Sequence, residues 1–492
     1  MRLKIKFLDW STGMPVAIIH PDTARELGVH AKDRVSVKRI DDGEAFSTVV
    51  DLASGLFKKN EIVVSSELKE RLELKEGQPV DVVFSQQSKS MEYIKEKLKG
   101  KELSKEKIFK IIKDVGNNSL SEAEISVFIS AMYVHGMKMK ETVYLVGAIL
   151  NSGKKLNFKN KYIVDKHCIG GIPGNRTTPL VVAICAAAGL IFPKSSSRAI
   201  TSAAGTSDTI ETLAQVDFKI EDVEKIVKKT GGCLVWGGDL GIVPADSKIL
   251  KIEKLIMVDP EAQLLASIMS KKLAAGSNYI LIDIPYGDSA KVSKERGLKL
   301  KKKFEFLGKA FKKEIKVVLT KGEEPIGNGI GPALEIIDVI KVLKQEEDRP
   351  KDLEKKSIYL AGQIFEMTKK AKKGKGEALA IEILKSKKAF KKFEEIIVAQ
   401  RGKVKELKMP KNKKEIIANK NCKIYSIDNK KINTLCRVAG CPVDKFSGVY
   451  LHKHLGEEIK KGERILTIYS ENPSKLKTAY DFYLKSKPFF IK

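Results

Sequence analysis

The sequence predicts a multidomain α/β protein with smaller domains at both ends. Its 492 residues suggest about three or four domains at roughly 100–200 residues each. In the central part, strand-like apolar runs such as CLVW (233–236), YILIDI (279–284) and KVVLT (316–320) alternate with helical segments. Such alternation is typical of an α/β sheet. An internal repeat precedes this central part, and a strand-rich stretch follows it.

The composition excludes several classes of protein. Hydrophobic residues make up 42% and charged residues 31%, which is typical of a globular chain and not of a disordered one. No apolar run approaches the ~18–20 residues needed to cross a bilayer, and MRLKIKFLDW at the N-terminus does not have the pattern of a signal peptide. The 6 cysteines include no CxxC pair, which argues against a disulfide scaffold or a structural zinc site. We therefore expect reduced thiols and a cytoplasmic protein.

The charge balance indicates an anionic ligand. The chain has 91 Lys and Arg against 62 Asp and Glu, a net charge of +29, which attracts phosphorylated metabolites, nucleic acid or a membrane surface. The lysines are spread along the chain, as in 301–316 and 369–376, and this is more typical of a solvated surface than of a nucleic-acid groove. Because no zinc-finger spacing and no aromatic RNA-binding motif occurs, nucleic-acid binding is the second functional class.

The first 85 residues contain the internal repeat, in which residues 24–37 match residues 69–82. Leu27 pairs with Leu72, and three further apolar pairs follow. Each copy has the pattern of a short helix, a turn and a strand. Because neither copy alone can bury its apolar face, the two are expected to close one small barrel. This arrangement resembles a double-psi β-barrel.

Helices, a sheet and a final strand-rich domain follow the barrel. Ser121 and Glu124 have capping-box spacing, and Gly136 is a usual helix stop. Residues 448–470 resemble a hammerhead or lipoyl-like half-barrel, but no lysine has the lipoyl context, so no prosthetic group is expected. The predicted domains are a small β-barrel over 1–85, a helical domain over 86–160 to which 245–276 returns, an α/β phosphate-binding domain with a mixed sheet over 161–244 and 277–402, and an α+β domain over 403–492.

The strongest chemical signal is KHCIGGIPGNRTT, residues 166–178. It lies between a predicted strand and a small-residue helix that has Pro179 in its first turn. Glycines let the backbone approach an anion closely, and a helix start offers free N–H groups. Lys166 adds charge and Thr178 adds a hydroxyl donor. The run predicts a phosphate site, although one glycine cluster by itself would favour a plain strand-to-helix turn; it matches neither a Walker loop nor a dinucleotide fingerprint.

The second signal is SSSRAITSAAGTSDTIE, residues 195–211. Its hydroxyls and its arginine are good partners for phosphate and ribose oxygens. The alternative interpretation is that Asp208 and Glu211 form a capping box of the following helix. Because two segments rich in anion donors are separated by only one helix, an anion site explains them better than a chance composition does.

The third signal is DPEAQLLASIMSKK, residues 259–272. Asp259 and Pro260 are typical of a helix start, with the aspartate as N-cap. Gln263, Ser267 and Lys271 lie on the same helical face as Asp259. This polar stripe is either an exposed face or one wall of a substrate cleft.

Other motifs are weaker. DIPYGDSAK (283–291) predicts a strand, a turn and a lysine, whereas GNGIGP (327–332) is interpreted as structural. His167 is either functional or a buried, hydrogen-bonded side chain. His452 and His454 share one face of a strand, but no acidic or cysteine cluster accompanies them, so no metal site is expected.

Together these blocks resemble the nucleoside phosphorylase family that includes thymidine and pyrimidine-nucleoside phosphorylases. The family form Lys-His-Ser-x-Gly-Gly is matched by 166–171, and SRAITSAAGT (197–206), DPEAQLLASIM (259–269) and the N-terminal barrel fit its archaeal AMP phosphorylase branch. The resemblance covers essentially the whole chain. It implies a helical domain facing a larger α/β domain across a closing cleft, with phosphate and nucleoside bound on opposite sides.

The resemblance also implies a role for individual residues. Asp259 would be the proton donor, and Lys271 matches a lysine on the base side. The phosphate nucleophile would be bound by Lys166, Thr178, Ser196 and Thr206. The nucleotide would be bound by Gly171, Ser197, Arg198, Ala199, Ile200, Thr201, Ser202, Thr206, Ser267 and Lys291.

Two stretches differ from the family pattern. The family serine after Lys-His is Cys168 here, and since a thiol is a weaker donor than a hydroxyl, only its backbone is expected to contact phosphate. The pyrimidine enzymes carry an Arg-Asp motif where this chain reads KIEKLIM (251–257). The second difference argues against a thymidine substrate.

The implied reaction is phosphorolysis of nucleoside 5′-monophosphates. AMP and phosphate would give adenine and ribose 1,5-bisphosphate for nucleotide salvage, with CMP and UMP as possible further substrates. A carboxylic acid at Asp259 could protonate purine N7 if its surroundings keep it protonated; otherwise another donor is needed. No metal or organic cofactor is implied, and a homodimer or higher homo-oligomer is expected. The alternatives are a pyrimidine-nucleoside (thymidine) phosphorylase and a non-catalytic relative that binds nucleic acid.

Overall fold

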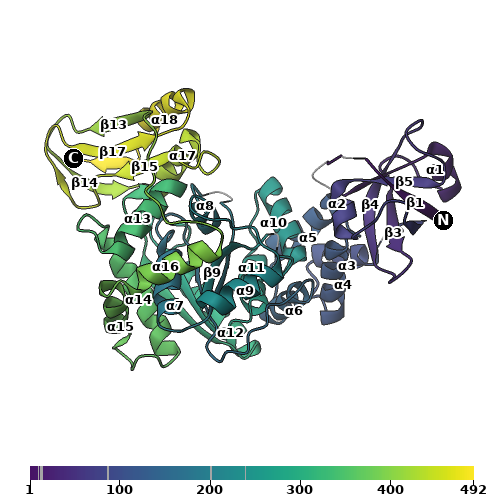
Figure 1. The fold of residues 1–492 in the computed structure, drawn as a ribbon, viewed down its shortest axis with the longest axis horizontal. Helices are drawn as coiled ribbons and strands as arrows, with labels where there is room; N and C mark the ends of the chain where they lie inside the picture. Colours follow the sequence, from purple (N-terminus) through teal and green to yellow (C-terminus); the bar gives the residue numbers. More distant parts are fainter. Residues whose placement is uncertain (9, 12–14, 86–87, 200–201, 239) are drawn as a thin grey trace. The chain divides into compact units, whose positions relative to one another are not determined.

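The structure is a computed structural model (Figure 1). It describes residues 1–492 except 9, 12–14, 86–87, 200–201 and 239. The chain divides into two compact units, Met1–Ser152 with Pro244–Ser267 and Gly153–Val243 with Ile268–Lys492. The first unit holds a barrel and a helical bundle, and the second holds a parallel sheet and the C-terminal domain. Among the helices described, none is long and apolar enough to cross a membrane.

A closed β-barrel forms the N-terminal part of the first unit. Its strands, in their order around the barrel, are β1 (Arg2–Phe7), β5 (Glu61–Val64), β2 (Val16–Ile19), β4 (Ala45–Leu52), β3 (Arg34–Arg39) and β6 (Pro79–Phe84). Helix α1 (Pro21–Leu27) follows β2, and helix α2 (Ser66–Arg71) follows β5.

The two sequence repeats form equivalent halves of this barrel. β2, α1 and β3 in one half correspond to β5, α2 and β6 in the other, and the parallel pair β1–β5 has its counterpart in the parallel pair β2–β4. The repeated residues Val35, Val37, Val80 and Val82 are fully buried in one common core. The prediction that two repeats close one barrel is therefore confirmed.

A helical bundle completes the first unit. Its helices are α3 (Ser90–Leu98), α4 (Lys105–Gly116), α5 (Glu122–His135), α6 (Met139–Leu150) and α10 (Pro244–Ile256), and α10 packs against α4 and α5. The predicted capping box is confirmed, because Ser121 N donates to Glu124 Oε2 at 2.7 Å and Glu124 N donates to Ser121 Oγ at 3.2 Å. The helix ends at Gly136, whose φ of 64° suits a glycine.

Lys248 on α10 lies where the bundle meets the barrel. Its ammonium donates to the carbonyl oxygens of Val115 and Gly116, at 3.1 and 3.0 Å. It also lies 4.9 Å from the ring centre of Phe46 in the barrel core. Burial, and next the positive charge of Arg71, lower the pKa of Lys248 to about 7. The folded chain thus holds this ammonium in surroundings that disfavour its charge.

We expect Lys248 to make the free energy of unfolding depend on pH between about 7 and 10.5. Between about pH 7 and its ordinary value of 10.5 the unfolded chain binds this proton and the folded chain does not, so stability rises with pH over that window. Lys248→Met should flatten the rise by a few kcal/mol, since one pKa unit is about 1.4 kcal/mol. Urea unfolding at pH 7, 8, 9 and 10 measures the free energy of unfolding and its dependence on pH.

The control is Lys251→Met, at an exposed position of the same helix, which should keep the wild-type dependence of stability on pH. A Lys248→Met variant whose stability rises with pH as steeply as that of the wild type would contradict the prediction.

A parallel sheet lies at the centre of the second unit. Strand β10 (Tyr279–Tyr286) pairs with β7 (Val164–Cys168) and β11 (Glu314–Lys321), while β8 (Phe192–Ser196) pairs with β9 (Gly232–Trp236), and all these pairs are parallel. A parallel bridge between Ile163 and Ile191 links the two sets. The predicted mixed sheet is therefore wrong for these strands. The reason is that helices connect them, and connections of that length join parallel strands.

Helices cover this sheet. They are α7 (Thr177–Ala187), α8 (Thr206–Ile210), α9 (Ile220–Thr230), α12 (Lys294–Ala310), α13 (Pro332–Lys344), α14 (Lys351–Met367), α15 (Gly376–Lys385) and α16 (Lys388–Ala399), with α11 (Glu261–Ala274) divided between the two units. α7 is almost wholly buried and packs against α14 and α16. Its small and branched side chains fit this position at the centre of the core.

The C-terminal domain is built on two small sheets, drawn in yellow in Figure 1. One has the order β12 (Gly329–Ile330), β15 (Gly448–Leu451), β17 (Arg464–Tyr469) and β13 (Lys413–Ile417), and the other has the order β16 (Glu458–Ile459), β14 (Cys422–Ile427) and β18 (Phe489–Ile491). Helices α17 (Asn429–Ala439) and α18 (Pro473–Ser486) pack together. Because β12 comes from the middle of the chain, the first sheet joins this domain to the rest of the unit.

Candidate functional site

Three of the motifs follow the carboxyl ends of neighbouring parallel strands. Residues 169–176 follow β7, residues 197–205 follow β8, and residues 287–293 follow β10. In an open α/β sheet these ends lie along one edge, and ligands bind there. The structure thus brings the first and second sequence signals and the weaker motif 283–291 to one edge of the second unit.

The loop after β7 is shaped for close backbone approach. Gly171 has a φ of 63°, in the left-handed region. A Cβ at Gly174 would lie 2.2 Å from Cys168 Sγ, and one at Gly170 would lie 2.5 Å from the ring of Pro285. A larger residue at Gly170 or Gly174 would therefore clash with neighbouring side chains. A plain strand-to-helix turn would not require glycine at these positions.

Lys166 is fully buried near the end of β7. Its ammonium donates to Thr177 Oγ1 at 2.6 Å and to Thr178 Oγ1 at 3.4 Å, and Thr177 Oγ1 donates onward to Gly174 O at 2.9 Å. Burial lowers the pKa of Lys166. The lysine is therefore linked to the first turn of α7 and to the glycine loop, and a bound anion would offset the cost of its burial.

A buried aspartate and two buried lysines form a second cluster of charges next to Lys166. Asp165 Oδ1 lies 3.0 Å from Lys194 Nζ, and Asp165 Oδ2 lies 3.1 Å from Lys272 Nζ. Lys194 also donates to the carbonyl oxygen of Lys166 at 2.8 Å. Burial lowers the pKa of Lys272. Lys194 and Lys272 thus share Asp165, and because Lys166 lies next to them, the buried lysines outnumber the aspartate, which favours an anionic ligand.

Cys168 faces a buried carboxylate. Its Sγ lies 3.5 Å from Asp283 Oδ2, while Thr320 donates to Asp283 Oδ1 at 2.7 Å and Lys356 lies 3.4 Å from Asp283 Oδ2. Burial, and next the charge of Asp283, raise the pKa of the Cys168 thiol to about 12. The thiol is therefore protonated and donates to Asp283. That the Cys168 side chain is not a phosphate ligand stays a prediction, and its contact with Asp283 agrees with it.

We expect Cys168→Ser to retain activity within about threefold, because a hydroxyl is smaller and also donates to Asp283; one hydrogen bond is worth only about 0.5–1.5 kcal/mol. Steady-state rates with AMP and phosphate, together with a thermal melt, measure this. Cys185→Ser, at a buried position in α7 away from any carboxylate contact, serves as the comparison and should lose stability. A collapse of activity in Cys168→Ser with an unchanged melt would instead give the thiol a direct role.

His167 is neutral at ordinary pH. Burial, and next the positive charges of Lys272 and Lys194, lower the pKa of its imidazole well below the usual value. A neutral imidazole both donates and accepts hydrogen bonds. Across the described residues, no group of three or more His, Cys, Asp or Glu side chains is placed to hold a metal ion.

The segment after β8 leads into the short helix α8. The side-chain oxygens of Ser195 and Ser196 are buried and make no hydrogen bond to any residue that the structure describes. The predicted capping box of Asp208 and Glu211 is wrong. Gly205 is the N-cap, and Asp208 Oδ2 accepts from Gly205 N at 2.9 Å and from Ala199 N at 2.7 Å.

The sequence misplaced this helix start because three residues that favour N-caps (Ser207, Asp208 and Thr209) follow one another here. Two of the predicted nucleotide ligands, Ile200 and Thr201, lie outside the described residues. Ser197 is exposed, and Ser202 and Thr206 are half-buried.

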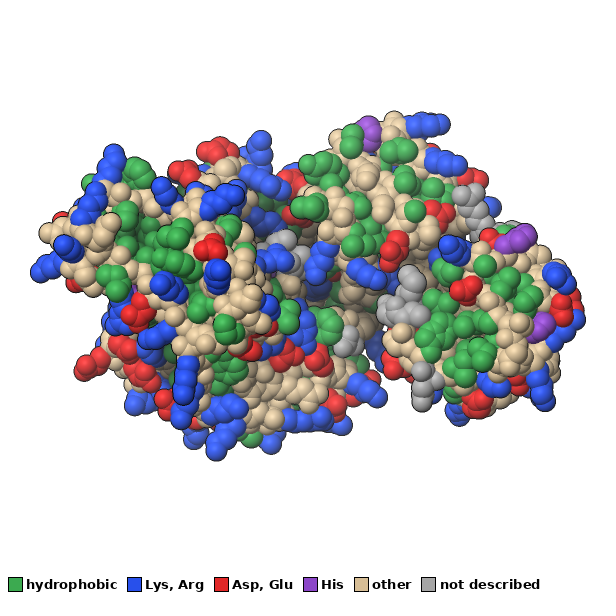
Figure 2. All heavy atoms as spheres, turned by 90° about the horizontal axis from the view of Figure 1, so that it is seen from above, with side chains coloured by type: hydrophobic (Ala, Val, Ile, Leu, Met, Phe, Trp, Pro, Cys, Tyr) green, Lys and Arg blue, Asp and Glu red, His purple; other side chains and the backbone are tan. Residues whose placement is uncertain are grey.

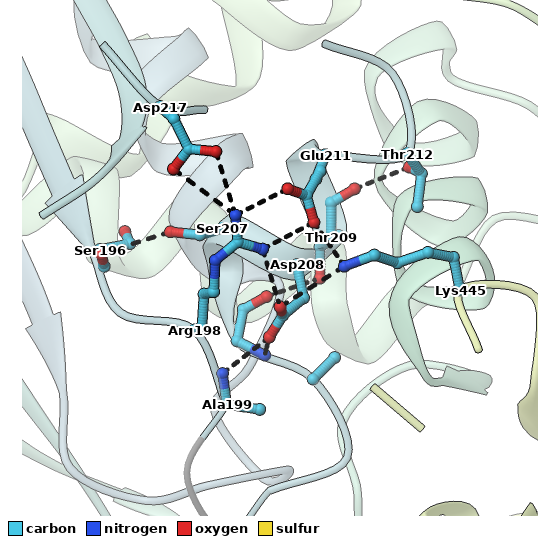
Figure 3. A network of polar contacts seen from close by, with 12 residues as sticks. Ser196, Arg198, Ala199, Ser207, Asp208, Thr209, Glu211, Thr212, Asp217 and Lys445 are labelled. Atoms are coloured by element: carbon cyan, nitrogen blue, oxygen red, sulfur yellow. Dashed lines mark hydrogen bonds and ion pairs between the residues drawn. The ribbon is translucent and has the colours of Figure 1, made fainter. Parts of the chain in front are cut away.

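Arg198 is held by carboxylates (Figure 3). Its guanidinium makes two hydrogen bonds of 2.7 Å to Glu211 and one of 3.2 Å to Asp217. It also lies 4.9 Å from the ring of Trp236. Lys445 adds an ion pair of 2.5 Å to Glu211. In this arrangement Arg198 fixes the start of the segment to α8, and its role as a nucleotide ligand stays a prediction.

Asp259 and Ser267 belong to the first unit. Helix α11 begins at Glu261, one residue later than predicted, and Leu264 N donates to Pro260 O at 2.9 Å. Asp259 is exposed. Ser267 and Gln263 are buried and donate to the two oxygens of Asp246, at 3.0 and 2.9 Å. This part of the polar stripe is therefore not an exposed face.

The two remaining predicted lysines lie in the second unit. Lys271 is half-buried on α11, and its charge contributes to the low pKa of His167. Lys291 is exposed in the loop after β10.

Sequence reasoning missed Lys194, Lys272 and Lys356. The sequence signal for Lys194 and Lys272 was Asp165 beside Lys166, since a buried aspartate requires a positively charged or hydrogen-bonding partner.

Comparisons with known proteins agree with this architecture. The helical bundle domain of a glycosyl transferase family matches residues 91–153, and the a/b domain of a glycosyl transferase family matches residues 160–390. The C-terminal domain of pyrimidine nucleoside phosphorylases matches residues 423–486. The AMP phosphorylases of Methanococcoides burtonii and Pyrococcus furiosus are each 40% identical over 496 aligned residues, which cover 100% of this chain and 97% and 98% of theirs.

The chain belongs to the AMP phosphorylase family. It is also 40% identical to a putative thymidine phosphorylase of Legionella pneumophila strain Paris, over 94% of this chain and 90% of that one. In fold, it resembles the crystal structure of anthranilate phosphoribosyltransferase from Thermus thermophilus, with a TM-score of 0.53 at 19% identity over 63% of this chain and 99% of that one. The family resemblance inferred from the motifs is thus confirmed, and so is a multidomain α/β chain with a helical bundle.

Proposed function

We propose that this protein phosphorolyses AMP, so that AMP and inorganic phosphate give adenine and ribose 1,5-bisphosphate. The observation that carries the proposal is a similarity to AMP phosphorylases that extends over the whole chain at 40% identity. The buried, positively charged strand end described above supports it, because both substrates are anions. The enzyme is then a pentosyltransferase of nucleotide salvage, and CMP and UMP are its further candidate substrates.

In this proposal Lys166 and Thr178 bind the attacking phosphate, together with Ser196 and Thr206. The hydrogen bonds from Lys166 to the hydroxyls of Thr177 and Thr178 fix the ammonium before phosphate arrives. Preorganised charge of this kind costs little reorganisation during the reaction. Holding phosphate in place also converts a bimolecular step into a local one.

Asp259 is proposed as the proton donor to the departing base; because it is exposed in the described chain, this role requires the bound nucleotide to cover its carboxyl group and keep it protonated. As the bond from the anomeric carbon to the base nitrogen breaks, the sugar gains positive character and the base gains the bonding electron pair. A proton delivered to purine N7 neutralises that charge, and general acid catalysis of this kind is worth about 10²–10⁴ in rate. The proposed nucleotide ligands are Gly171, Ser197, Arg198, Ala199, Ile200, Thr201, Ser202, Thr206, Ser267 and Lys291, with Lys271 on the base side.

A nucleoside phosphorylase that acts without the 5′-phosphate is the second candidate, and the similarity to a putative thymidine phosphorylase favours testing it. A nucleic-acid-binding role has weaker support. Lys and Arg side chains lie scattered among acidic ones on the face drawn in Figure 2, whereas a nucleic-acid site gathers them on one face or along one groove. A titration with duplex DNA across salt concentrations tests it, since phosphate contacts give a steep salt dependence.

We expect the 5′-phosphate to decide substrate choice. Phosphate-dependent base release should be compared for AMP, CMP, UMP, adenosine and thymidine at equal concentrations. AMP should exceed adenosine in kcat/KM at least about tenfold, the amount that one hydrogen bond to a charged group supports. Omission of phosphate is the control and should abolish release. Equal kcat/KM for adenosine or thymidine would favour the second candidate.

The proposal also covers the folds of the two terminal domains, the domain limits, the oligomeric state and the cellular location. We infer a double-psi arrangement for the N-terminal barrel, which the twofold relation between its parallel pairs supports, and a hammerhead-like C-terminal domain. The domain limits 1–85, 86–160 with 245–276, 161–244 with 277–402, and 403–492 are proposed with them. A homodimer or higher homo-oligomer and a cytoplasmic location complete the proposal.

A further inference from the structure

We propose that the C-terminal domain positions the substrate loops, and that Asn433 and Lys445 are the positioning residues for the segment 202–211. This inference deepens the proposed function and rests on it. Its basis is that the loops after four strands of the parallel sheet, β7, β8, β10 and β11, are each fastened to residues beyond 426. Those loops occupy the edge where a ligand binds in such a fold.

The first two loops each place an apolar side chain in the C-terminal core. Ile172, from the glycine loop after β7, and Ala203, from the segment after β8, are buried in the same cluster as Ile432, Leu435 and Cys436 of α17. A buried side chain in a close-packed core has little freedom to move. Motion of either loop would therefore have to disturb the core of the C-terminal domain.

A specific hydrogen bond reinforces the second of these anchors. Ala203 N donates to Asn433 Oδ1 at 2.7 Å, joining two residues that lie 230 positions apart in the chain. Ala203 lies three residues before Thr206, which is proposed to bind both phosphate and nucleotide. The amide of Ala203 is buried, so the hydrogen bond cannot be replaced by water without cost.

The other two loops are held by the first turn of α17 and by the turn that follows β15. Asn429 Nδ2 donates to Ser289 Oγ at 2.9 Å, in the loop after β10, and to Gly322 O at 3.0 Å, directly after β11. Glu324 accepts from Leu455 N at 3.0 Å. Next to these contacts, the two-residue strand β12 pairs with β15 of the C-terminal sheet. The domain thus contacts the loops after four of the five parallel strands.

An ion pair adds a further contact between the C-terminal domain and the segment after β8. Lys445 pairs with Glu211 at 2.5 Å and with Asp208 at 3.6 Å, the two carboxylates that also hold Arg198 and the amide of Ala199 (Figure 3). One lysine of the C-terminal domain therefore stabilises both ends of the segment that leads from β8 into α8. None of these contacts is with a group proposed to touch the reacting atoms, so Asn433 and Lys445 are positioning residues.

The test compares variants of the full-length chain. Asn433→Ala removes the acceptor for Ala203 N, and Lys445→Met removes the charge that faces Glu211. Asn421→Ala and Lys413→Met are the matched controls: Asn421 accepts from Lys461 N at 2.8 Å and Lys413 pairs with Glu415 at 2.9 Å, so each control loses the same kind of contact in the same domain. Amide hydrogen exchange at Ala203, KM and kcat for AMP, and thermal melting are measured for each.

We expect exchange at Ala203 to rise at least about tenfold in Asn433→Ala, and KM for AMP to rise about three- to tenfold in both test variants with a smaller change in kcat; one hydrogen bond of ordinary strength supports such changes. Asn433→Asp keeps the acceptor oxygen and should restore the protection of Ala203. The controls should leave exchange and KM unchanged. Unchanged protection in Asn433→Ala, or raised exchange with an unchanged KM, would overturn the inference.

These outcomes separate the inference from the function on which it rests. If the wild-type chain released no adenine from AMP, the proposed function would be wrong. Exchange at Ala203 needs no substrate, so it would still decide whether the C-terminal domain holds the loop. A lower melting temperature with wild-type exchange and wild-type KM would assign Asn433 and Lys445 to domain stability alone and would also overturn the inference.

Discussion

Replacement of Asp259 by asparagine is expected to lower turnover at least about a hundredfold, the lower range for loss of a general acid. Asparagine keeps the shape of the side chain but cannot deliver a proton to the base. Stability should change little, because Asp259 is exposed and asparagine caps a helix start about as well as aspartate does. Initial rates, calorimetric binding of AMP and a thermal melt measure the three effects. AMP should still bind.

The leaving group provides a further check on Asp259. The loss should be smaller for substrates whose base departs more easily, since they depend less on protonation. Asp222→Asn, in the first turn of α9, is the matched control and should keep wild-type turnover. Activity of Asp259→Asn within a few-fold of wild type would exclude Asp259 as the donor and would direct attention to the neutral imidazole of His167.

Lys166→Met should raise KM for phosphate at least about tenfold and lower kcat as well, because a hydrogen bond to a charged group contributes about 1.5–3 kcal/mol. The variant should fold, since methionine fills much of the same volume without a buried charge. Phosphate saturation curves at fixed AMP measure both constants. Lys299→Met, at an exposed position on α12, is the control. Wild-type dependence on phosphate would remove Lys166 from the site.

The lowered pKa of Lys166 adds a pH dependence to this prediction. Burial shifts its titration below the ordinary value of 10.5, so the wild-type enzyme should lose affinity for phosphate as alkaline pH removes the proton. KM for phosphate should therefore rise between neutral and alkaline pH in the wild type. In Lys166→Met the corresponding rise should be absent.

Much of the local structure was predictable because it depends on neighbours in the chain. The repeat in residues 24–37 and 69–82, the capping box of Ser121 and Glu124, and the glycine loop between β7 and α7 were each readable from a short stretch. Periodicity and glycine content act within a few residues. The start of α8 was misread, since several consecutive residues could each have served as its N-cap, and local pattern could not choose among them.

The order of the elements, the two segments rich in anion donors and the family to which they point could all be predicted from local sequence. The parallel pairing of the central sheet, the sharing of Asp165 by Lys194 and Lys272, and the hydrogen bond from Ala203 to Asn433 became visible only in the folded chain. The partners in these contacts lie far apart in the chain, and nothing in the short stretch around either residue specifies the other. Whether a lysine is a solvated surface charge or a buried one depends on the packing of several elements around it. Packing brings distant segments together and removes water from them, and through that burial it decides the charge and hydrogen-bonding state of the site.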